Sequence, residues 1–203
     1  MVMKMKIYDI SQEVFTCNVY EGDPSPKKKI ISSMDKGDLY NLTYFSMCAH
    51  NGTHVDAPYH FIKEGKSIDL MPLEAFVGMC YVGEYNGVLD EKNAINILNK
   101  AKSYGKDAYK RILIKGDVVV SLEASKVFAS ANILLLGNES QTVGPLDSPM
   151  EVHKTLLGCN IVLLEGICLS NVNEGVYLLN AAPLNLKDAD GSPCRAILID
   201  LNS

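Results

Sequence analysis

Three of the chain's four histidines and one aspartate lie within eleven residues, between positions 50 and 60. Their spacing is regular, because His50 and His54 are four residues apart and His54, Asp56 and His60 follow at even intervals. Imidazole and carboxylate groups together form a ligand set that suits zinc or manganese. The stretch therefore predicts a metal site.

The residues between these groups predict a shaped loop and not a helix. Gly52 permits backbone conformations that are closed to other residues. Pro58 lacks an N–H and disfavours helical geometry at Ala57. A metalloprotease helix would need a Glu directly after its first His, and Asn51 stands there instead. The four-residue spacing of the first two histidines is therefore not interpreted as that helix.

Two side chains far along the chain could join the site. Glu165 follows four apolar residues, and burying a carboxylate there is costly unless it is paired or binds metal. An exposed strand end is the alternative. His153 falls early in a helix predicted to start at Ser148-Pro149-Met150-Glu151, a capping box. The positive helix end favours a neutral imidazole, the form that binds metal, although a capping or surface histidine is the alternative.

Six candidate groups exceed what one tetrahedral zinc ion takes. Either two metal ions bind, or one candidate is free to transfer protons. Two divalent ions about 3.5–4 Å apart can share a water and polarise a carbonyl, and the pKa of bound water falls to about 7. No G-x-S-x-G nucleophile motif occurs, which favours attack by water. A structural metal site without catalysis is an alternative, but such sites favour cysteine and none joins this cluster.

The stretch from position 50 to 60 resembles the H-x-G-T-H-x-D-x-P-x-H motif of the cyclase family, with every fixed position present. That family includes bacterial kynurenine formamidases and isatin hydrolases. His153-x-x-Leu156-Leu157 with Glu165-Gly166 is similar to the family's second metal segment, and 177–184 and 192–196 resemble its usual ending. The resemblance implies an α/β fold over residues 1–203: a single swivelling β/β/α domain with a mixed sheet.

The same resemblance implies a role for each candidate residue. It implies two zinc ions per subunit, with manganese as an alternative. Asp56 would bridge the two ions, and His60 would remain as the acid/base residue. The implied ligands are His50, His54 and Asp56 for the first ion and Asp56, His153 and Glu165 for the second. It also implies a homodimer or a homotetramer.

By resemblance the activity is that of an arylformamidase, which hydrolyses N-formylkynurenine to kynurenine and formate. The alternative enzyme is a hydrolase of a cyclic amide or related small carbonyl compound, as isatin hydrolase is. Tyr20-x-Gly22-Asp23-Pro24 resembles the segment whose aromatic residue contacts substrate, so Tyr20 is expected to line the pocket; a plain surface loop is the alternative. The sequence departs from the formamidases at Tyr20, where they commonly carry Trp, and at 137–142, where they usually carry Asp and Ser.

Composition limits the other possibilities. The chain has 203 residues, is 47% hydrophobic and carries a net charge of −5, as an ordinary globular protein does. Only Lys27–Lys29 forms a basic run, expected on a solvated loop, so no nucleic-acid partner is predicted and the partner is a small-molecule substrate. No stretch approaches the roughly 20 apolar residues of a membrane helix. Six cysteines without C-x-x-C pairs and no signal peptide predict a cytoplasmic protein without disulfides.

Apolar periodicity and caps predict the elements around the site. Strands are predicted at 6–10, 42–49, 76–85, 111–115, 132–137, 161–165, 175–182 and 194–201. Helices are predicted at 90–105, with Asp90 as its cap, after Ser121, and from Ser148 to Gly158. The strand at 42–49 is expected to deliver His50 at its end.

Overall fold

A nine-stranded mixed sheet forms the centre of the computed structural model, which describes residues 5–201. Its order is β1-β13-β11-β5-β7-β9-β10-β4-β12. The four strands β5, β7, β9 and β10 run parallel, and the strands outside them pair antiparallel. The strands are β1 Lys6–Asp9, β4 His54–Asp56, β5 Val77–Glu84, β7 Arg111–Lys115, β9 Leu135–Asn138, β10 Val162–Glu165, β11 Gly175–Asn180, β12 Gly191–Pro193 and β13 Ile197–Asp200. The expected mixed α/β architecture is confirmed.

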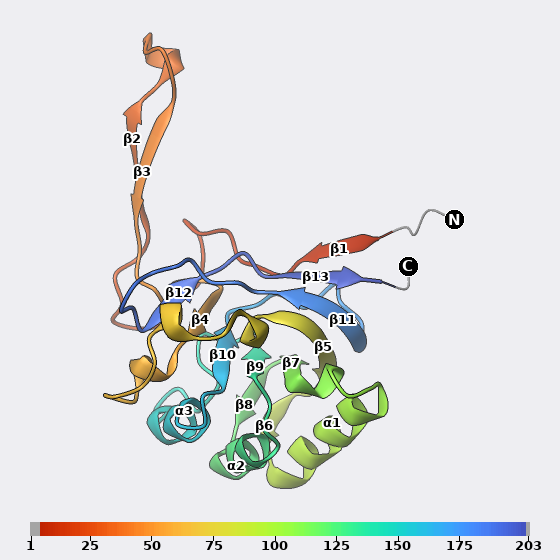
Figure 1. Cartoon of the computed structure of the whole chain (residues 1–203). Coiled ribbons are helices and arrows are strands. Elements are labelled where there is room, and N and C mark those ends of the chain that lie inside the picture. The colour runs from red at the N-terminus through yellow and green to blue at the C-terminus, as the bar shows by residue number, and fades with distance from the viewer. Residues whose placement is uncertain (1–4, 202–203) are drawn as a thin grey trace.

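Three α-helices lie on one side of this sheet (Figure 1). They are α1 Glu91–Ser103, α2 Leu122–Ser130 and α3 Met150–Leu157. Asp90 caps α1 as predicted, since its side chain accepts a hydrogen bond from the Asn93 N–H at 2.8 Å. Ser121 caps α2 in the same way, accepting from the Ala124 N–H at 3.1 Å. Short 3₁₀ helices are Met34–Lys36, Pro58–His60, Ile68–Leu70, Leu73–Ala75 and Ala108–Lys110.

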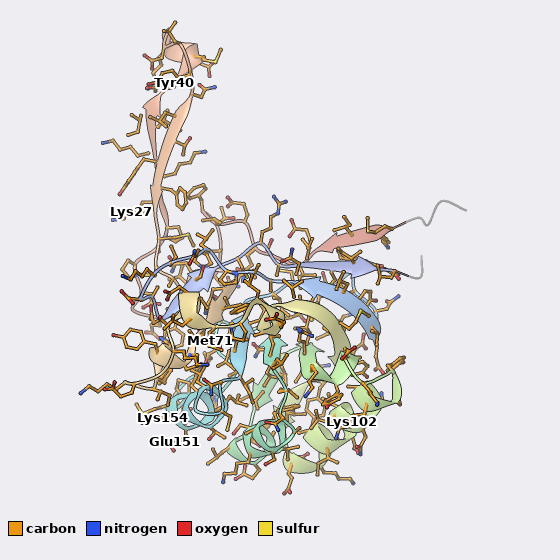
Figure 2. The ribbon with its side chains drawn as sticks, viewed as in Figure 1. Lys27, Tyr40, Met71, Lys102, Glu151 and Lys154 are labelled. Carbon is orange, nitrogen blue, oxygen red and sulfur yellow. The ribbon has the colours of Figure 1, made fainter. Side chains whose placement is uncertain are left out.

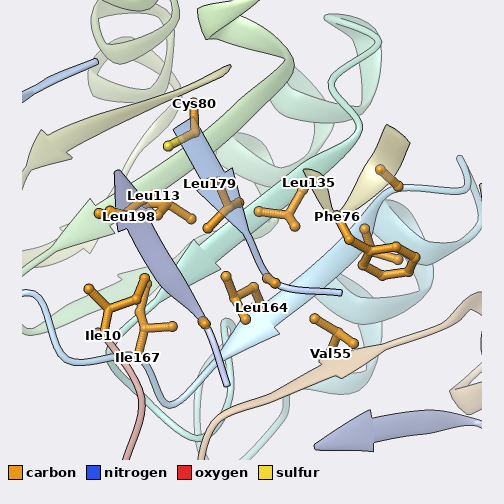
Figure 3. Packing of buried hydrophobic residues seen from close by; sticks show 14 of the residues in the cluster. Ile10, Val55, Phe76, Cys80, Leu113, Leu135, Leu164, Ile167, Leu179 and Leu198 are labelled. Carbon is orange, nitrogen blue, oxygen red and sulfur yellow. The ribbon is translucent and has the colours of Figure 1, made fainter. Parts of the chain in front are cut away.

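Both faces of the central strands are buried, and successive side chains point to opposite faces. On β10, Leu163 packs in the cluster beneath the helices and Leu164 packs in the opposite cluster. The second cluster lies within the curl of the sheet and includes Ile10, Val55 and Leu198 (Figure 3). The apolar runs that predicted β9 and β10 are therefore strands covered on both sides.

A long two-stranded hairpin projects from this body (Figure 1). We call residues 27–46 the arm; its strands are β2 Lys27–Ser32 and β3 Leu42–Ser46, paired only with each other. The prediction of one strand over 42–49 that delivers His50 is wrong, because β3 ends at Ser46 and belongs to the arm. The basic run Lys27–Lys29 is exposed as expected but forms a strand and not a loop. A further small parallel pair joins β6 Gly87–Leu89 and β8 Val118–Val120.

Two other local predictions are wrong. The residues 54–56 form strand β4 and not a loop, because β4 pairs with β10 on one side and β12 on the other. The capping box at Ser148 does not form, since Pro149 occupies the N-cap with helical dihedrals and no side chain caps the helix. The Ser148 hydroxyl donates instead to the Asp147 carboxylate at 3.3 Å.

Among residues 5–201, no helix has both the length and the apolar character needed to cross a membrane.

Candidate metal centre

The centre of the site is strand β4, which is held between two neighbours. Because side chains alternate along a strand, His54 and Asp56 point to one face while Val55 enters the core on the other. Glu165 lies directly opposite His54 on β10. All three polar side chains are almost completely buried, with exposed fractions of 1%, 1% and 2% for His54, Asp56 and Glu165. Strand pairing alone therefore brings two carboxylates and one imidazole together.

Backbone carbonyls orient two of the imidazoles toward these carboxylates. The Nδ1 of His54 lies 3.0 Å from the Gly52 carbonyl, and the Nδ1 of His153, on α3, lies 2.9 Å from the Pro149 carbonyl. Each carbonyl accepts the Nδ1–H, which leaves Nε2 as the nitrogen that faces the cluster. The backbone of Gly52 has a φ of +63°, in the left-handed region that favours glycine, and this conformation sets the direction of its carbonyl.

The inward nitrogens lie among the carboxylate oxygens. His54 Nε2 is 3.3 Å from Asp56 Oδ1 and 3.4 Å from Glu165 Oε2. His153 Nε2 is 3.3 Å from Glu165 Oε1 and 3.8 Å from Asp56 Oδ2. The backbone N–H of Val143 donates to Glu165 Oε1 at 2.9 Å and so fixes that carboxylate.

The other two histidines lie on the open side of Asp56. The Nδ1 of His50 is 2.8 Å from Asp56 Oδ1, and its Nε2 is 2.8 Å from Asp190 Oδ2. His60 stacks on His50 with ring centroids 4.0 Å apart, and its Nδ1 is 3.2 Å from the same Asp190 oxygen. A Cβ at Gly191 would approach His50 Cε1 to 2.7 Å, so the ring position depends on a glycine there.

Without a cation, the imidazoles carry the positive charge of this cluster. Burial opposes the charged form of His54, but the attraction of the nearby carboxylates of Asp56 and Glu165 outweighs burial and raises the pKa of His54 to about 10. The same balance, with Asp190 and Asp56 as partners, raises the pKa of His50 to about 9. Burial would raise the pKa of Asp56, but hydrogen bonds from His50 and His54 hold it well below its usual value.

The arrangement fits a pair of metal ions on two observations. His54 Nε2 and Asp56 Oδ2 are buried and have no hydrogen-bond partner among the described residues, although ligand atoms surround them. Buried polar atoms are seldom left so, and metal coordination would satisfy both. In addition, two groups of three residues have ligand atoms within 4.8 Å of one another, and both contain Asp56. The groups are His50, Asp56 and His60, and His54, Asp56 and Glu165. Nitrogen and oxygen donors of this kind suit zinc or manganese.

These two groups differ from the two ligand sets that the family resemblance implies. In the structure, His60 is grouped with His50, and His54 is grouped with Glu165; the resemblance instead pairs His54 with His50 and Glu165 with His153. Asp56 is common to both divisions, as a bridging residue would be. The assignment of His60 as a proton-transfer group and not a ligand stays a prediction.

A cavity of about 380 Å³ opens onto the cluster. Tyr20 lines it as expected, and its hydroxyl donates to the Leu146 carbonyl at 3.2 Å across the cavity edge. Gln141 and Thr142 also line the cavity. The Gln141 amide and the Thr142 hydroxyl are buried and have no hydrogen-bond partner among the described residues.

The five predicted ligands, the predicted acid/base residue His60 and Tyr20 thus lie together at one cavity, which all of them except Asp56 line. Further polar residues there had no role assigned from the sequence. Asp190 is the most important of these, since it contacts both His50 and His60. Its only signal is a polar turn before the buried Gly191. Gln141 and Thr142 lie in the segment that was noted only as a departure from the formamidases.

Comparison with known proteins places the chain among metal-dependent hydrolases of this architecture. The family model described as "Putative cyclase" matches residues 8–144. A kynurenine formamidase of Salinibacter ruber (strain DSM 13855 / M31) is 33% identical, over 97% of this chain and 98% of that protein. The chain belongs to the cyclase family.

Solved structures agree with that placement. One described as a potential metal-dependent hydrolase with cyclase activity has a TM-score of 0.82 and 25% identity, covering 97% of this chain and 98% of its own. Isatin hydrolase A from Labrenzia aggregata, bound to benzyl benzoate, has a TM-score of 0.83 at 22% identity, covering 97% of this chain and 94% of its own. The second likeness is one of fold.

Proposed function

We propose that the chain is a metal-dependent amide hydrolase, an arylformamidase that cleaves N-formylkynurenine to kynurenine and formate. The observation that carries the proposal is Asp56, which belongs to both groups of ligand atoms and has one buried oxygen without a hydrogen-bond partner among the described residues. Full-length similarity to kynurenine formamidases supports the choice of substrate.

The residues proposed to hold the metal are His50, His54, Asp56, His153 and Glu165. Two zinc ions, or manganese in their place, would polarise the carbonyl of the substrate and lower the pKa of a water toward neutral pH. The chain orients these ligands in advance, because carbonyls fix two Nδ1 atoms and the Val143 N–H fixes Glu165. Preorganised groups of this kind lose little free energy to reorganisation during the reaction.

His60 is proposed to give a proton to the departing aryl amine. Asp190 contacts its Nδ1, which sets the ring orientation and stabilises the protonated imidazole. The ring also packs edge-on against Phe61, with centroids 4.5 Å apart. An amine leaves poorly unless it is protonated, so an acid held beside the ligand cluster is what amide cleavage requires.

The remaining lining residues are proposed to bind the substrate. Phe61 and Tyr20 provide aromatic surface for an aryl group, since both line the cavity. The unpartnered amide of Gln141 and hydroxyl of Thr142 can hydrogen-bond its polar substituents. A volume of about 380 Å³ fits a small molecule and not a polymer.

A second candidate, hydrolysis of a cyclic amide, is favoured by one observation. The formamidases usually carry Asp and Ser in the segment where this chain has the neutral pair Gln141 and Thr142 at the cavity wall. A neutral wall would suit a substrate that lacks the charged amino-acid group of N-formylkynurenine.

One experiment separates these functions. The zinc- or manganese-reconstituted protein is assayed against N-formylkynurenine, isatin and simple lactones. We expect the highest kcat/KM with N-formylkynurenine, whereas a preference for isatin would establish the second candidate. A fully metal-loaded, folded protein that hydrolyses none of them would be a metal-binding protein without this catalysis.

A further inference from the structure

Three carboxylates line the cavity beside the ligand cluster, and they differ in their partners. They belong to Asp23, Glu165 and Asp190. Glu165 accepts a hydrogen bond from the Val143 N–H and lies beside two imidazoles, and Asp190 also contacts two imidazoles. The carboxylate of Asp23 has neither a hydrogen bond nor an ion pair within residues 5–201. Asp23 is therefore the lining carboxylate that the described part of the chain leaves without a partner.

A tight turn brings Asp23 to the cavity together with Tyr20. The Asp23 N–H donates to the Tyr20 carbonyl at 3.1 Å, which closes a four-residue turn. Gly22, the third residue, has a φ of +96°, in the left-handed region that the third residue of a type II turn adopts. Tyr20 and Asp23 both line the cavity, whereas the exposed Glu21 between them does not. The turn thus presents a carboxylate beside the aromatic side chain proposed to contact the aryl group.

The chain supplies no free cation to this carboxylate. No Lys or Arg of residues 5–201 lines the cavity, and its histidines pair with other carboxylates. Lys27, the first basic residue after Asp23, lies exposed on the arm (Figure 2). Lys154 is adjacent to His153 in the sequence but is exposed on α3 (Figure 2). An unpaired carboxylate in such a cavity favours a ligand that brings its own positive charge.

Two unpartnered polar groups line the same cavity from another segment of the chain. Thr142 is only 3% exposed and its hydroxyl has no hydrogen-bond partner among the described residues, and the same holds for the amide of Gln141. A hydroxyl and an amide N–H can both donate to an anion. The cavity therefore combines one charged acceptor with two neutral donors, which matches an α-amino-acid group with its ammonium and its carboxylate.

We propose that Asp23 binds the α-ammonium group of the substrate and so selects aryl formamides that carry a free amino-acid group. This inference rests on the proposed arylformamidase function and names a residue that determines its substrate. A hydrogen bond between an ammonium and a carboxylate is charge-assisted and stronger than a neutral one. The ammonium group is remote from the carbonyl that reacts, so the contact is made equally before and during the reaction and acts on KM more than on kcat. Isatin has no ammonium group and would not use Asp23.

The first test compares three aryl formamides with the metal-loaded enzyme. They are N-formylkynurenine, its desamino analogue with hydrogen in place of the α-amino group, and 2-formamidoacetophenone, which lacks the amino-acid group. Asp23→Asn should lower kcat/KM for N-formylkynurenine by about 10- to 100-fold, mainly by raising KM, and should leave the other two little changed. Glu21→Gln is the matched control, since it removes the same charge from the same turn on a side chain outside the cavity. All three rates should stay unchanged in that control.

The second test measures binding without turnover. Titration calorimetry with the metal-loaded protein compares kynurenine with its own desamino analogue. We expect the wild type to bind kynurenine more tightly than the analogue, and Asp23→Asn to bind the two alike.

The outcomes separate this inference from the proposed function. Equal affinities in the wild type, or equal losses on all three formamides in Asp23→Asn, would overturn the role of Asp23 and leave the formamidase activity standing. A wild type that hydrolyses isatin but none of the formamides would overturn the proposed function instead. The calorimetry would still decide whether Asp23 binds an ammonium group, because it does not depend on catalysis.

Discussion

A single carboxylate, Asp190, holds two imidazoles in the site. It contacts His50 Nε2 at 2.8 Å and His60 Nδ1 at 3.2 Å, and the two rings stack. Hydrogen bonds from both imidazoles hold the pKa of Asp190 far below its usual value, so it stays ionised. A permanent negative charge therefore lies beside His60 and fixes the orientation of its ring.

His60→Ala is expected to keep most of the metal and lose turnover. General acid–base catalysis contributes about 10²–10⁴-fold, so kcat on an amide should fall by that order. The loss should be smaller for a formyl ester, because an alkoxide or phenoxide leaves with less need of a proton. Metal content by elemental analysis and kcat on both substrates check this prediction.

His50→Ala serves as the contrast, since a ligand should lose metal and activity together. If His60→Ala empties the site, the geometric group of His50, Asp56 and His60 is the ligand set instead. Equal losses for amide and ester would mean that His60 positions the substrate and transfers no proton.

Asp190→Asn should lower kcat without emptying the site. An amide keeps the shape of the side chain and one hydrogen bond but removes the negative charge beside His60. Partners of this kind typically contribute about 10–100-fold, so a loss within that range is expected. The loss should be larger on an amide than on a formyl ester, as expected if Asp190 acts through the proton that His60 transfers. Equal losses on both substrates would assign Asp190 a purely structural role.

The sequence was enough to predict which side chains could bind metal, but not which residues hold those side chains in place. Three histidines and an aspartate in one stretch, and Glu165 after an apolar run, carry recognisable signals. Asp190 carries only the weak signal of a polar turn, because its role depends on β12 pairing beside β4, a contact between residues 135 positions apart. A hydrogen bond across such a separation leaves no local pattern.

At the scale of elements, the register between strands β4 and β10 determines where the candidate ligands lie. His54 lies opposite Glu165, and Asp56 lies opposite Leu163, so one antiparallel pairing fixes three groups at once. A shift of one residue would turn both β4 ligands into the core. The buried strands were predictable from continuous apolar runs. The arm was not, because its exposed strands follow no burial pattern.

A helix cap offers a stability test at this scale. Asp90→Ala removes the side chain that accepts the Asn93 N–H, and such caps contribute about 1 kcal/mol. We expect urea unfolding to show a loss of that order, with metal content unchanged. Asp107→Ala is the matched control, because Asp107 precedes a 3₁₀ helix without a side-chain cap bond. Equal losses in the two variants would contradict a capping contribution at Asp90.

For the whole molecule, metal binding and folding share one set of contacts. The site joins β4, β10 and α3, so a bound ion cross-links three elements that the unfolded chain does not hold together. Removal of metal should therefore lower Tm, and added zinc should raise it further as the free zinc concentration increases above Kd.

The increase in Tm on adding zinc should depend on pH, and the pKa values of the histidines determine whether it grows or shrinks as pH rises. In the metal-free protein the pKa values of His50 and His54 are about 9 and about 10, above the ordinary value of 6.5. A raised pKa contributes stability that is complete below the unfolded value of about 6.5 and is lost as pH rises through 9 to 10. Zinc must displace those protons, so its apparent affinity rises with pH, by about tenfold per unit for each proton released.

The increase in Tm on adding zinc should accordingly be larger at pH 8.5 than at pH 6.5, measured by scanning calorimetry at one zinc concentration. Titration calorimetry in two buffers of different ionisation enthalpy should show proton release on binding at pH 7. His54→Gln keeps a polar side chain but cannot be protonated, so the variant should release fewer protons. An equal Tm increase at both pH values, or binding without proton release, would mean that the imidazoles are neutral before metal arrives.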